Sequence, residues 1–312
     1  MKKIKPLIRW VILGGTLFFF LTALKDHWEE FKNVRLESGG WLMLAIALTI
    51  TLMAHVWSGL VWSWILATFK LNIGKKWAIA VYLKTNIAKY IPGNVWHYYG
   101  RITAVKTAGA SVGIASLSVL LEPLLMAAAA AIIILVSGGL DSIEIDNISN
   151  WKLQIFCLGV VLVGVHPCIL NPLLRLVTRL KGNKDNDGKI YIKQYPLLPL
   201  LGEIGFVGLR GIGFLFVLLA LMKFSPTQIP HLFAVFSFAW LLGLIVPGAP
   251  GGMGVFEATA IALVDKHQFS YGIILSLVAS YRAISILAEA IAAGAVSTDF
   301  LQKFRKEERS KG

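Results

Sequence analysis

The chain has 312 residues, of which 56% are hydrophobic and 15% are charged, and its mean hydropathy is +0.70. Soluble proteins carry about 25% charged residues, so this composition excludes an ordinary soluble globular protein. The net charge is +13. Because the basic residues lie mostly in loops between apolar blocks, they favour membrane topology and anionic lipid over nucleic acid as the explanation.

Six apolar blocks are long enough to cross the hydrocarbon core of a bilayer, which takes roughly 20 residues. They are Leu7–Leu24, Trp41–Phe69, Gly113–Val136, Leu153–Leu174, Leu197–Met222 and Tyr271–Val296. A buried helix of a soluble domain rarely stays apolar over such a length. We therefore predict an all-α, multi-pass membrane helix bundle in which residues 1–312 form a single integral membrane domain.

Lysine and arginine gather on the cytoplasmic side of membrane proteins and thereby orient the spans. Basic residues precede the first block, fill the loops at 70–76 and 175–193, and end the chain. The loops at 25–40 and 141–146 are instead mixed or acidic. This distribution predicts that both termini are cytoplasmic.

Two further apolar segments are interrupted in the middle and are not typical of ordinary spans. The first, 77–105, contains Ile91-Pro92-Gly93-Asn94, and the second, 231–266, contains Val246-Pro247-Gly248-Ala249-Pro250-Gly251-Gly252. The neighbouring spans fix the side on which each segment begins and ends. We therefore expect the first to enter the membrane from the cytoplasmic face and return, and the second to do so from the opposite face.

The resulting order is span, span, re-entrant hairpin and span, repeated once with the second copy inverted. We predict a first repeat over about 7–137, a second over about 152–297, and a basic cytoplasmic tail over 298–312. Inverted-topology repeats occur in many transporters, whose binding sites lie where the Pro- and Gly-interrupted segments of the two halves meet near the bilayer midplane.

The two breaks are the first candidates for a site. Proline removes a backbone donor, and a freed polar group in lipid is costly unless protein or water satisfies it. The breaks should therefore be buried or line a wet cavity, with the helices that restart near Asn94 and Gly254 directing their positive ends toward it. An anion suits such a place. Two packing kinks are the alternative, because proline is common in membrane helices.

Ionisable residues at membrane depth add to this site, since each is costly in hydrocarbon. Ion pairs that only hold the bundle together are the alternative. Glu203 and Arg210 lie seven residues apart on one helix face, as do Arg282 and Glu289. The substrate-binding candidates are Pro92, Gly93, Asn94, Arg101, Glu122, Arg210, Pro250, Gly251, Gly252, Gly254, Glu257 and Arg282.

Arg101, Lys89 and His55 could also lie at the membrane interface. Arg101 could clamp a phosphate or extend to the lipid headgroups. We expect Lys89 to extend to the headgroups. His55 lies among several tryptophans, and we expect it to belong to an interfacial aromatic belt.

Enzyme signatures are weak. The stretch Gly109-Ala110-Ser111-Val112-Gly113 matches the nucleophile elbow of hydrolases, but that elbow requires a preceding strand. The cysteines and histidines lack metal-ligand spacing. We therefore predict no enzymatic activity, cofactor or metal. A membrane enzyme that uses Glu257 or Glu122 as a base stays open as an alternative.

Two motifs resemble a known family. They are Lys89-Tyr90-Ile91-Pro92-Gly93-Asn94-Val95-Trp96 with Arg101, and Pro247-Gly248-Ala249-Pro250-Gly251-Gly252-Met253-Gly254-Val255-Phe256-Glu257. They are similar to the membrane region of lysylphosphatidylglycerol synthase/flippase proteins and of their stand-alone flippase-like relatives. The resemblance covers essentially the whole chain, the Pro-Gly-Gly-x-Gly-x-x-Glu pattern is its more specific motif, and Arg282 falls where the family tends to carry an arginine.

The resemblance implies a flippase that moves a phospholipid, aminoacyl-lipid or polyprenyl-linked lipid between the leaflets of a bacterial-type plasma (inner) membrane. It implies anionic or aminoacylated membrane lipids as partners, a lipid-synthesising enzyme as a further partner, and no bound cofactor. The 312 residues contain no soluble aminoacyl-transfer domain, so lysyl transfer is not implied, and the first motif has less glycine than many relatives. The alternatives are a membrane transferase or accessory subunit acting on a lipid-linked substrate, and an ion-coupled solute transporter.

Overall fold

The fold is described from a computed structural model, which covers residues 22, 25–71, 73–91, 94–138, 151–169, 171–172, 192, 194–246 and 249–311. Almost all of the predicted first span therefore lies outside the described residues, as do Pro92 and Gly93. Over 297–311 the structure describes the backbone. Every regular element in the described ranges is helical, which confirms the predicted all-α fold.

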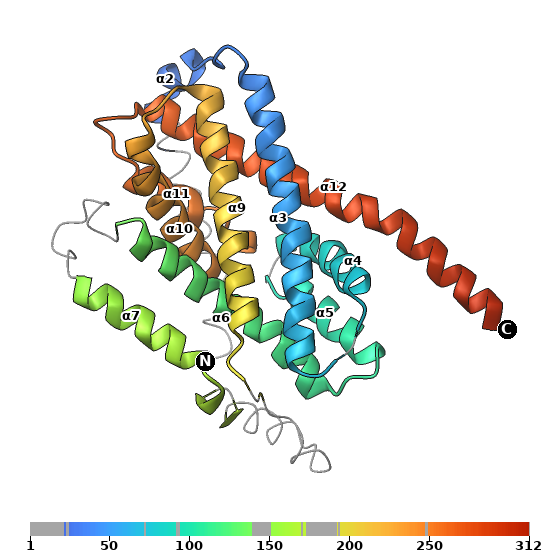
Figure 1. Cartoon of the computed structure of the whole chain (residues 1–312). Coiled ribbons are helices and arrows are strands. Elements are labelled where there is room, and N and C mark those ends of the chain that lie inside the picture. The colour runs from blue at the N-terminus through green and yellow to red at the C-terminus, as the bar shows by residue number, and fades with distance from the viewer. Residues whose placement is uncertain are drawn as a thin grey trace, which may run out of the picture.

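The α-helices are α2 (Trp28–Asn33), α3 (Gly40–Thr68), α4 (Lys75–Asn86), α5 (Trp96–Thr107), α6 (Val112–Val136), α7 (Trp151–Gly164), α9 (Leu197–Leu221), α10 (Ile229–Ile245), α11 (Val255–Leu263) and α12 (Tyr271–Lys311). Three short 3-10 helices are η1 (Ile87–Tyr90), η4 (Pro226–Gln228) and η5 (Pro250–Gly252). Figure 1 shows their arrangement as a bundle from which the end of α12 projects.

Five helical segments of the described chain are long and apolar enough to cross a membrane: Gly40–Thr68, Val112–Val136, Leu197–Leu221, Pro226–Ile245 and Tyr271–Val296. Four of them match predicted spans to within one residue at each end. The multi-pass character of the chain is therefore confirmed.

The predicted fourth span, Leu153–Leu174, is wrong as a single helix. The described helix α7 ends at Gly164, and the chain turns at Val165 and His166 before Pro167. Proline cannot donate to the preceding turn and its ring blocks helix propagation behind it, which explains a stop at this point. At 14 residues, α7 is about 21 Å long and shorter than a bilayer core of about 30 Å.

Helices α3 and α9 form the antiparallel centre of the bundle (Figure 1). The backbone N–H of Glu37, just before α3, donates to the carbonyl of Ala220 near the end of α9 at 2.9 Å. Gly202 allows the close approach, because a Cβ atom there would lie 2.6 Å from Val61 and 2.8 Å from Trp64. Small residues at such positions are typical of packed membrane helices.

Both interrupted segments form hairpins of two helices. In the first, α4 and α5 lie within two residues of the predicted 77–105 boundaries. In the second, the side-chain amide of Gln228 donates to Gln268, so the start of the first arm and the end of the second lie together. This hairpin is uneven: its first arm, Pro226–Ile245, is itself long enough to cross a membrane, whereas α11 has 9 residues.

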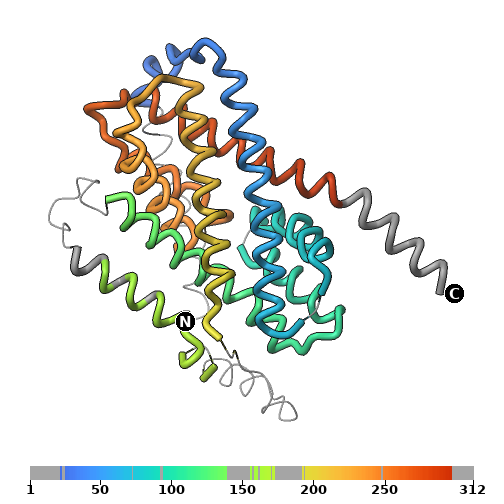
Figure 2. The backbone as a smooth tube through the Cα atoms, viewed as in Figure 1, coloured from blue at the N-terminus to red at the C-terminus, as the bar shows by residue number. Residues whose placement is uncertain are grey.

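The two hairpins enter the bundle from opposite ends. Six residues separate the end of α3 from the start of α4, and four separate the end of α9 from the start of the α10 arm. Because α3 and α9 are antiparallel, these two starting points lie at opposite ends of the bundle, as the tube in Figure 2 also shows. The predicted tail at 298–312 continues α12 as a helix to Lys311.

Candidate functional site

The two breaks meet in the interior of the bundle. The 3-10 turn η1, which precedes the first break, lies against η5 in the second. A Cβ atom added to Gly251 would lie 2.9 Å from Cε1 of Tyr90 and 3.4 Å from Cε of Lys89. The irregular backbone of both hairpins is therefore packed together inside protein, where its polar groups can find partners.

Glycine determines the backbone path of the second break. Gly251, Gly252 and Gly254 have φ angles of +59°, +73° and +83°, in the left-handed region that other residues disfavour. Gly252 also packs on the backbone of Gly243 in α10, since an added Cβ would lie 3.1 Å from both its Cα and its carbonyl oxygen. In the first break, Asn94 has a φ of +50°, which asparagine tolerates better than most residues.

Arg282 of α12 and Glu257 of α11 stabilise the second break. They form an ion pair through Nε and Oε1, and the terminal nitrogens of Arg282 donate to the carbonyls of Gly251 (3.2 Å) and Gly252 (3.4 Å). The second oxygen of Glu257 accepts the N–H of Gly254 at 2.7 Å and caps α11. Side chains thus satisfy backbone groups that the break leaves without helical partners.

Arg101 of α5 and Glu122 of α6 form a second ion pair, with side chains only 2% and 3% exposed. The hydroxyl of Tyr82 donates to the other Glu122 oxygen at 2.7 Å and accepts from Ser58 at 2.7 Å. The guanidinium of Arg101 lies 3.8 Å from the centre of the Tyr82 ring, and its Nε donates to Thr85 at 3.3 Å. Both charges are paired and hydrogen-bonded, as burial of an ion pair requires.

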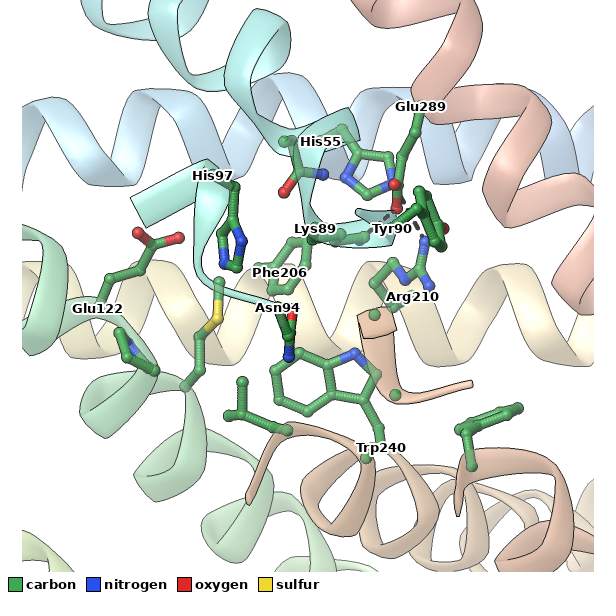
Figure 3. Close-up of a pocket in the computed structure, with 18 of the residues that line it drawn as sticks. His55, Lys89, Tyr90, Asn94, His97, Glu122, Phe206, Arg210, Trp240 and Glu289 are labelled. Carbon is green, nitrogen blue, oxygen red and sulfur yellow. Dashed lines mark hydrogen bonds and ion pairs between the residues drawn. The ribbon is translucent and has the colours of Figure 1, made fainter. Parts of the chain in front are cut away.

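A third cluster surrounds Glu289 of α12, on the side of the cavity away from Glu122 (Figure 3). Oε1 of Glu289 accepts from Nζ of Lys89 at 2.6 Å and lies 3.2 Å from Nε2 of His55. The same Nε2 lies 3.2 Å from Nη1 of Arg210. Among the described residues no carboxylate pairs with Arg210, and Oε2 of Glu289 has no hydrogen-bond partner.

These clusters surround a cavity of about 120 Å³. A single water needs about 10–15 Å³ of such space, so the cavity has room for several waters or a small polar group. Its charged lining consists of Lys89, Arg101, Arg210, Arg282, Glu122 and Glu289. Glu257 pairs with Arg282 from outside this lining. Each of the other three cations in the lining has a carboxylate partner. Arg210 therefore contributes one positive charge that no carboxylate of the described residues balances.

Glu203 does not change this balance. The residue is 0% exposed, it lies outside the cavity lining, and neither of its oxygens has a hydrogen-bond partner in the described part of the chain. An isolated carboxylate in such surroundings is far more costly than a neutral acid. We therefore treat Glu203 as uncharged.

Four of the ionisable residues that line the cavity lie near the middle of apolar helices. His55 follows the central residue of α3 directly, and Arg210 that of α9. Glu122 lies two residues before the centre of α6, and Arg282 lies within two residues of the centre of Tyr271–Val296. At 1.5 Å per residue, each is within about 3 Å of its helix midpoint along the axis. The cavity is therefore at the centre of the apolar helix lengths.

The cavity is lined by seven of the residues predicted from the sequence: Asn94, Arg101, Glu122, Arg210, Gly251, Gly252 and Arg282. Pro92 and Gly93 fall outside the described residues. Pro250, Gly254 and Glu257 belong to the second break but do not line the cavity. At the start of α11, Glu257 occupies the Gly254 N–H, so this donor is not available to an anion.

Three residues that line the cavity, His55, Lys89 and Glu289, were not among the predicted site residues. His55 is not in an interfacial belt, since it is 2% exposed and lines the cavity. Lys89 does not extend to the headgroups, because it pairs with Glu289 inside the bundle. The one available signal was the spacing of Arg282 and Glu289, which places both on the face of α12 that lines the cavity.

In comparisons with known proteins, no family model matched the chain, and no curated protein matched it.

Proposed function

We propose that this chain translocates a phosphate-bearing, polar-headed lipid between the two leaflets of a membrane. The headgroup passes through the central cavity while the acyl chains stay in the lipid. This division fits a cavity of about 120 Å³, which has room for a small polar group but not for a whole lipid.

Arg210 is the observation that carries the proposal. Its side chain is buried at the middle of an apolar helix, lines the cavity, and has no carboxylate partner among the described residues. A cation at this depth is costly, by at least about 2.5–3.5 kcal/mol near the centre of a membrane helix. A phosphate suits it well, because the planar guanidinium can donate two parallel hydrogen bonds to phosphate oxygens.

The arrangement of the hairpins supports movement around this site. They enter from opposite ends, their breaks meet, and the cavity lies between them. In transporters with inverted repeats, one half rocks against the other around a fixed central site. We extend this to the present chain as two repeats, with both termini cytoplasmic. The motif resemblance to the lysylphosphatidylglycerol synthase/flippase membrane region agrees with a lipid substrate.

A leaflet-exchange assay tests the proposal. The purified chain is placed in liposomes that contain phosphatidylglycerol with a fluorescent label on one acyl chain, and an impermeant reductant is added outside. We expect label from the inner leaflet to become accessible faster than in empty vesicles, and Arg210→Gln to slow this exchange at least tenfold. Arg35→Gln is the matched control, because Arg35 is exposed, and it should retain the wild-type rate.

Three results would count against the proposal. Exchange equal to that of empty vesicles, with folded protein confirmed, would contradict lipid translocation. A wild-type rate in Arg210→Gln would remove Arg210 from the route. Uptake of water-soluble glycerol phosphate without lipid exchange would instead favour a solute transporter.

A further inference from the structure

One nitrogen of His55 lies close to both a hydrogen-bond donor and a hydrogen-bond acceptor. Nε2 lies 3.2 Å from Nη1 of Arg210 and 3.2 Å from Oε1 of Glu289 (Figure 3). An arginine nitrogen only donates hydrogen bonds, and an ionised carboxylate oxygen only accepts them. Nε2 can therefore accept from Arg210 when it carries no proton, or donate to Glu289 when it carries one, but it cannot do both.

The neutral Nδ1–H tautomer of His55 and its imidazolium, which carries a proton on both nitrogens, leave Arg210 in different situations. With Nε2 unprotonated, His55 accepts a hydrogen bond from Nη1 of Arg210. With Nε2 protonated, His55 turns its hydrogen bond to Glu289, whose Oε2 also lacks a partner in the described chain. The Nη1 donor of Arg210 is then free for another acceptor in the cavity, while Nη2 keeps its 3.2 Å hydrogen bond to Ser285.

The charges around His55 couple its proton to an anion. Arg210 of α9 and Lys89 of η1 oppose a third positive charge, whereas Glu289 of α12 favours it. Tyr82 of α4 and Glu122 of α6 line the same cavity, but they hydrogen-bond to each other and, through Glu122, to Arg101. An anion beside Arg210 would offset the repulsion and favour the charged form of His55.

We propose that His55 is a proton-binding site linked to an anion site at Arg210, so that one proton enters the cavity with each phosphodiester headgroup. The inference rests on the proposed function for the identity of the anion. The proton comes from water on the side where the headgroup enters, and it leaves with the headgroup on the other side. No covalent bond other than the N–H changes. The pair carries no net charge, and a proton gradient can drive its movement.

A binding measurement tests the linkage without any transport. The full chain in detergent is titrated with dihexanoyl phosphatidylglycerol, whose phosphodiester does not titrate between about pH 5 and pH 8, the range in which histidine changes charge. Calorimetry in two buffers of different ionisation enthalpy gives the number of protons taken up. We expect about one proton per ligand, and a Kd that rises about tenfold per pH unit where the proton is linked. Zero proton uptake by the wild-type protein would overturn the inference.

Variants assign the proton to a residue. His55→Gln should abolish both the proton uptake and the pH dependence of the Kd, whatever its remaining affinity. His267→Gln is the matched control, because His267 is exposed in the loop before α12, and it should keep both. Undiminished proton uptake in folded His55→Gln would overturn the assignment to His55.

The liposome assay separates this inference from the proposed function. Label exchange with no response to an imposed pH gradient, together with binding that takes up no proton, would refute the proton linkage and leave lipid translocation standing. Binding with proton uptake but no exchange for any headgroup would retain the linkage and refute translocation. Absence of both binding and exchange in folded protein would refute both.

Discussion

Arg282 of α12 and Glu257 of α11 form an ion pair that also orders the backbone between two helices. The arginine donates to the carbonyls of Gly251 and Gly252, and the carboxylate accepts the N–H of Gly254. One salt bridge therefore serves three backbone groups of the second break. Geometry as well as charge decides whether a substitution is tolerated.

Arg282→Lys should weaken this break although it retains the positive charge. A single ammonium cannot reach Glu257 and both carbonyls as the planar guanidinium does. With a hydrogen bond worth about 0.5–1.5 kcal/mol, we expect a loss of roughly 1–3 kcal/mol in unfolding free energy. The thermal midpoint in detergent measures this, with the exposed Arg35→Lys as control. Equal midpoints for the two variants would show that charge alone suffices.

Gly252→Ala should destabilise the fold more than Gly39→Ala. Both glycines have left-handed backbones, with φ of +73° and +81°, so both variants incur the same strain, of roughly 1–2 kcal/mol. The Cβ at Gly39 meets nothing within 4 Å, whereas that at Gly252 meets the backbone of Gly243 at 3.1 Å. Overpacking should add about 1–3 kcal/mol. Similar unfolding midpoints would contradict the close packing of η5 on α10.

Glu122→Gln should be severely destabilising. It leaves Arg101 buried without its counter-ion, and loss of one member of a buried pair costs about 3–5 kcal/mol. Glu29→Gln is the control, because the Glu29 carboxylate is 78% exposed beside Lys32 and such pairs contribute about 0–1 kcal/mol. Replacing both buried partners, as in Arg101→Gln with Glu122→Gln, should recover part of the loss. An effect of Glu122→Gln as small as that of Glu29→Gln would contradict the described pairing of Glu122 with Arg101.

The helices and the positions of the breaks could be predicted because local sequence determines both. Long apolar runs form membrane helices, and clusters of Pro and Gly interrupt them, whereas single residues such as Pro123 in α6 and Gly211 in α9 lie within continuous helices. The predicted fourth span was wrong because hydropathy stays high across Pro167, although the proline ends the preceding helix. From Pro167 onward, residues 167–169 and 171–172 are described as helical. The second hairpin was predicted from hydropathy to begin at residue 231. Its first arm begins instead at Pro226, after the N-cap residue Ser225.

The partners within the site could not be predicted, because they depend on packing between distant segments. Lys89 and Glu289 are 200 residues apart in sequence, and His55 and Arg210 are 155 apart. The nearby tryptophans favoured an interfacial position for His55, yet Trp62 is itself completely buried. Membrane depth limited the set of candidate residues, and only the fold shows which of them face the cavity.

Spin labels on α3 should place the cavity at the bilayer midplane. Met53 lies next to the central residue of α3 and is 59% exposed, and Trp41 lies near its start and is 77% exposed. The two positions are about 18 Å apart along the helix. With Cys157 and Cys168 replaced by serine, a label at Met53→Cys should collide mostly with dissolved oxygen. A label at Trp41→Cys should collide mostly with a water-soluble nickel complex. Water-like accessibility at position 53 would contradict a central cavity.

The claim that the headgroup passes through the cavity is tested most directly by blocking the cavity. Leu244 lines it, whereas Ile245, the next residue of α10, is 59% exposed. Each is replaced by cysteine in the cysteine-free protein and treated with a bulky methanethiosulfonate in the leaflet-exchange assay. The account predicts that modification at Leu244→Cys stops exchange of the labelled lipid and that modification at Ile245→Cys leaves it unchanged. Undiminished exchange after complete modification at Leu244→Cys would contradict a route through this cavity.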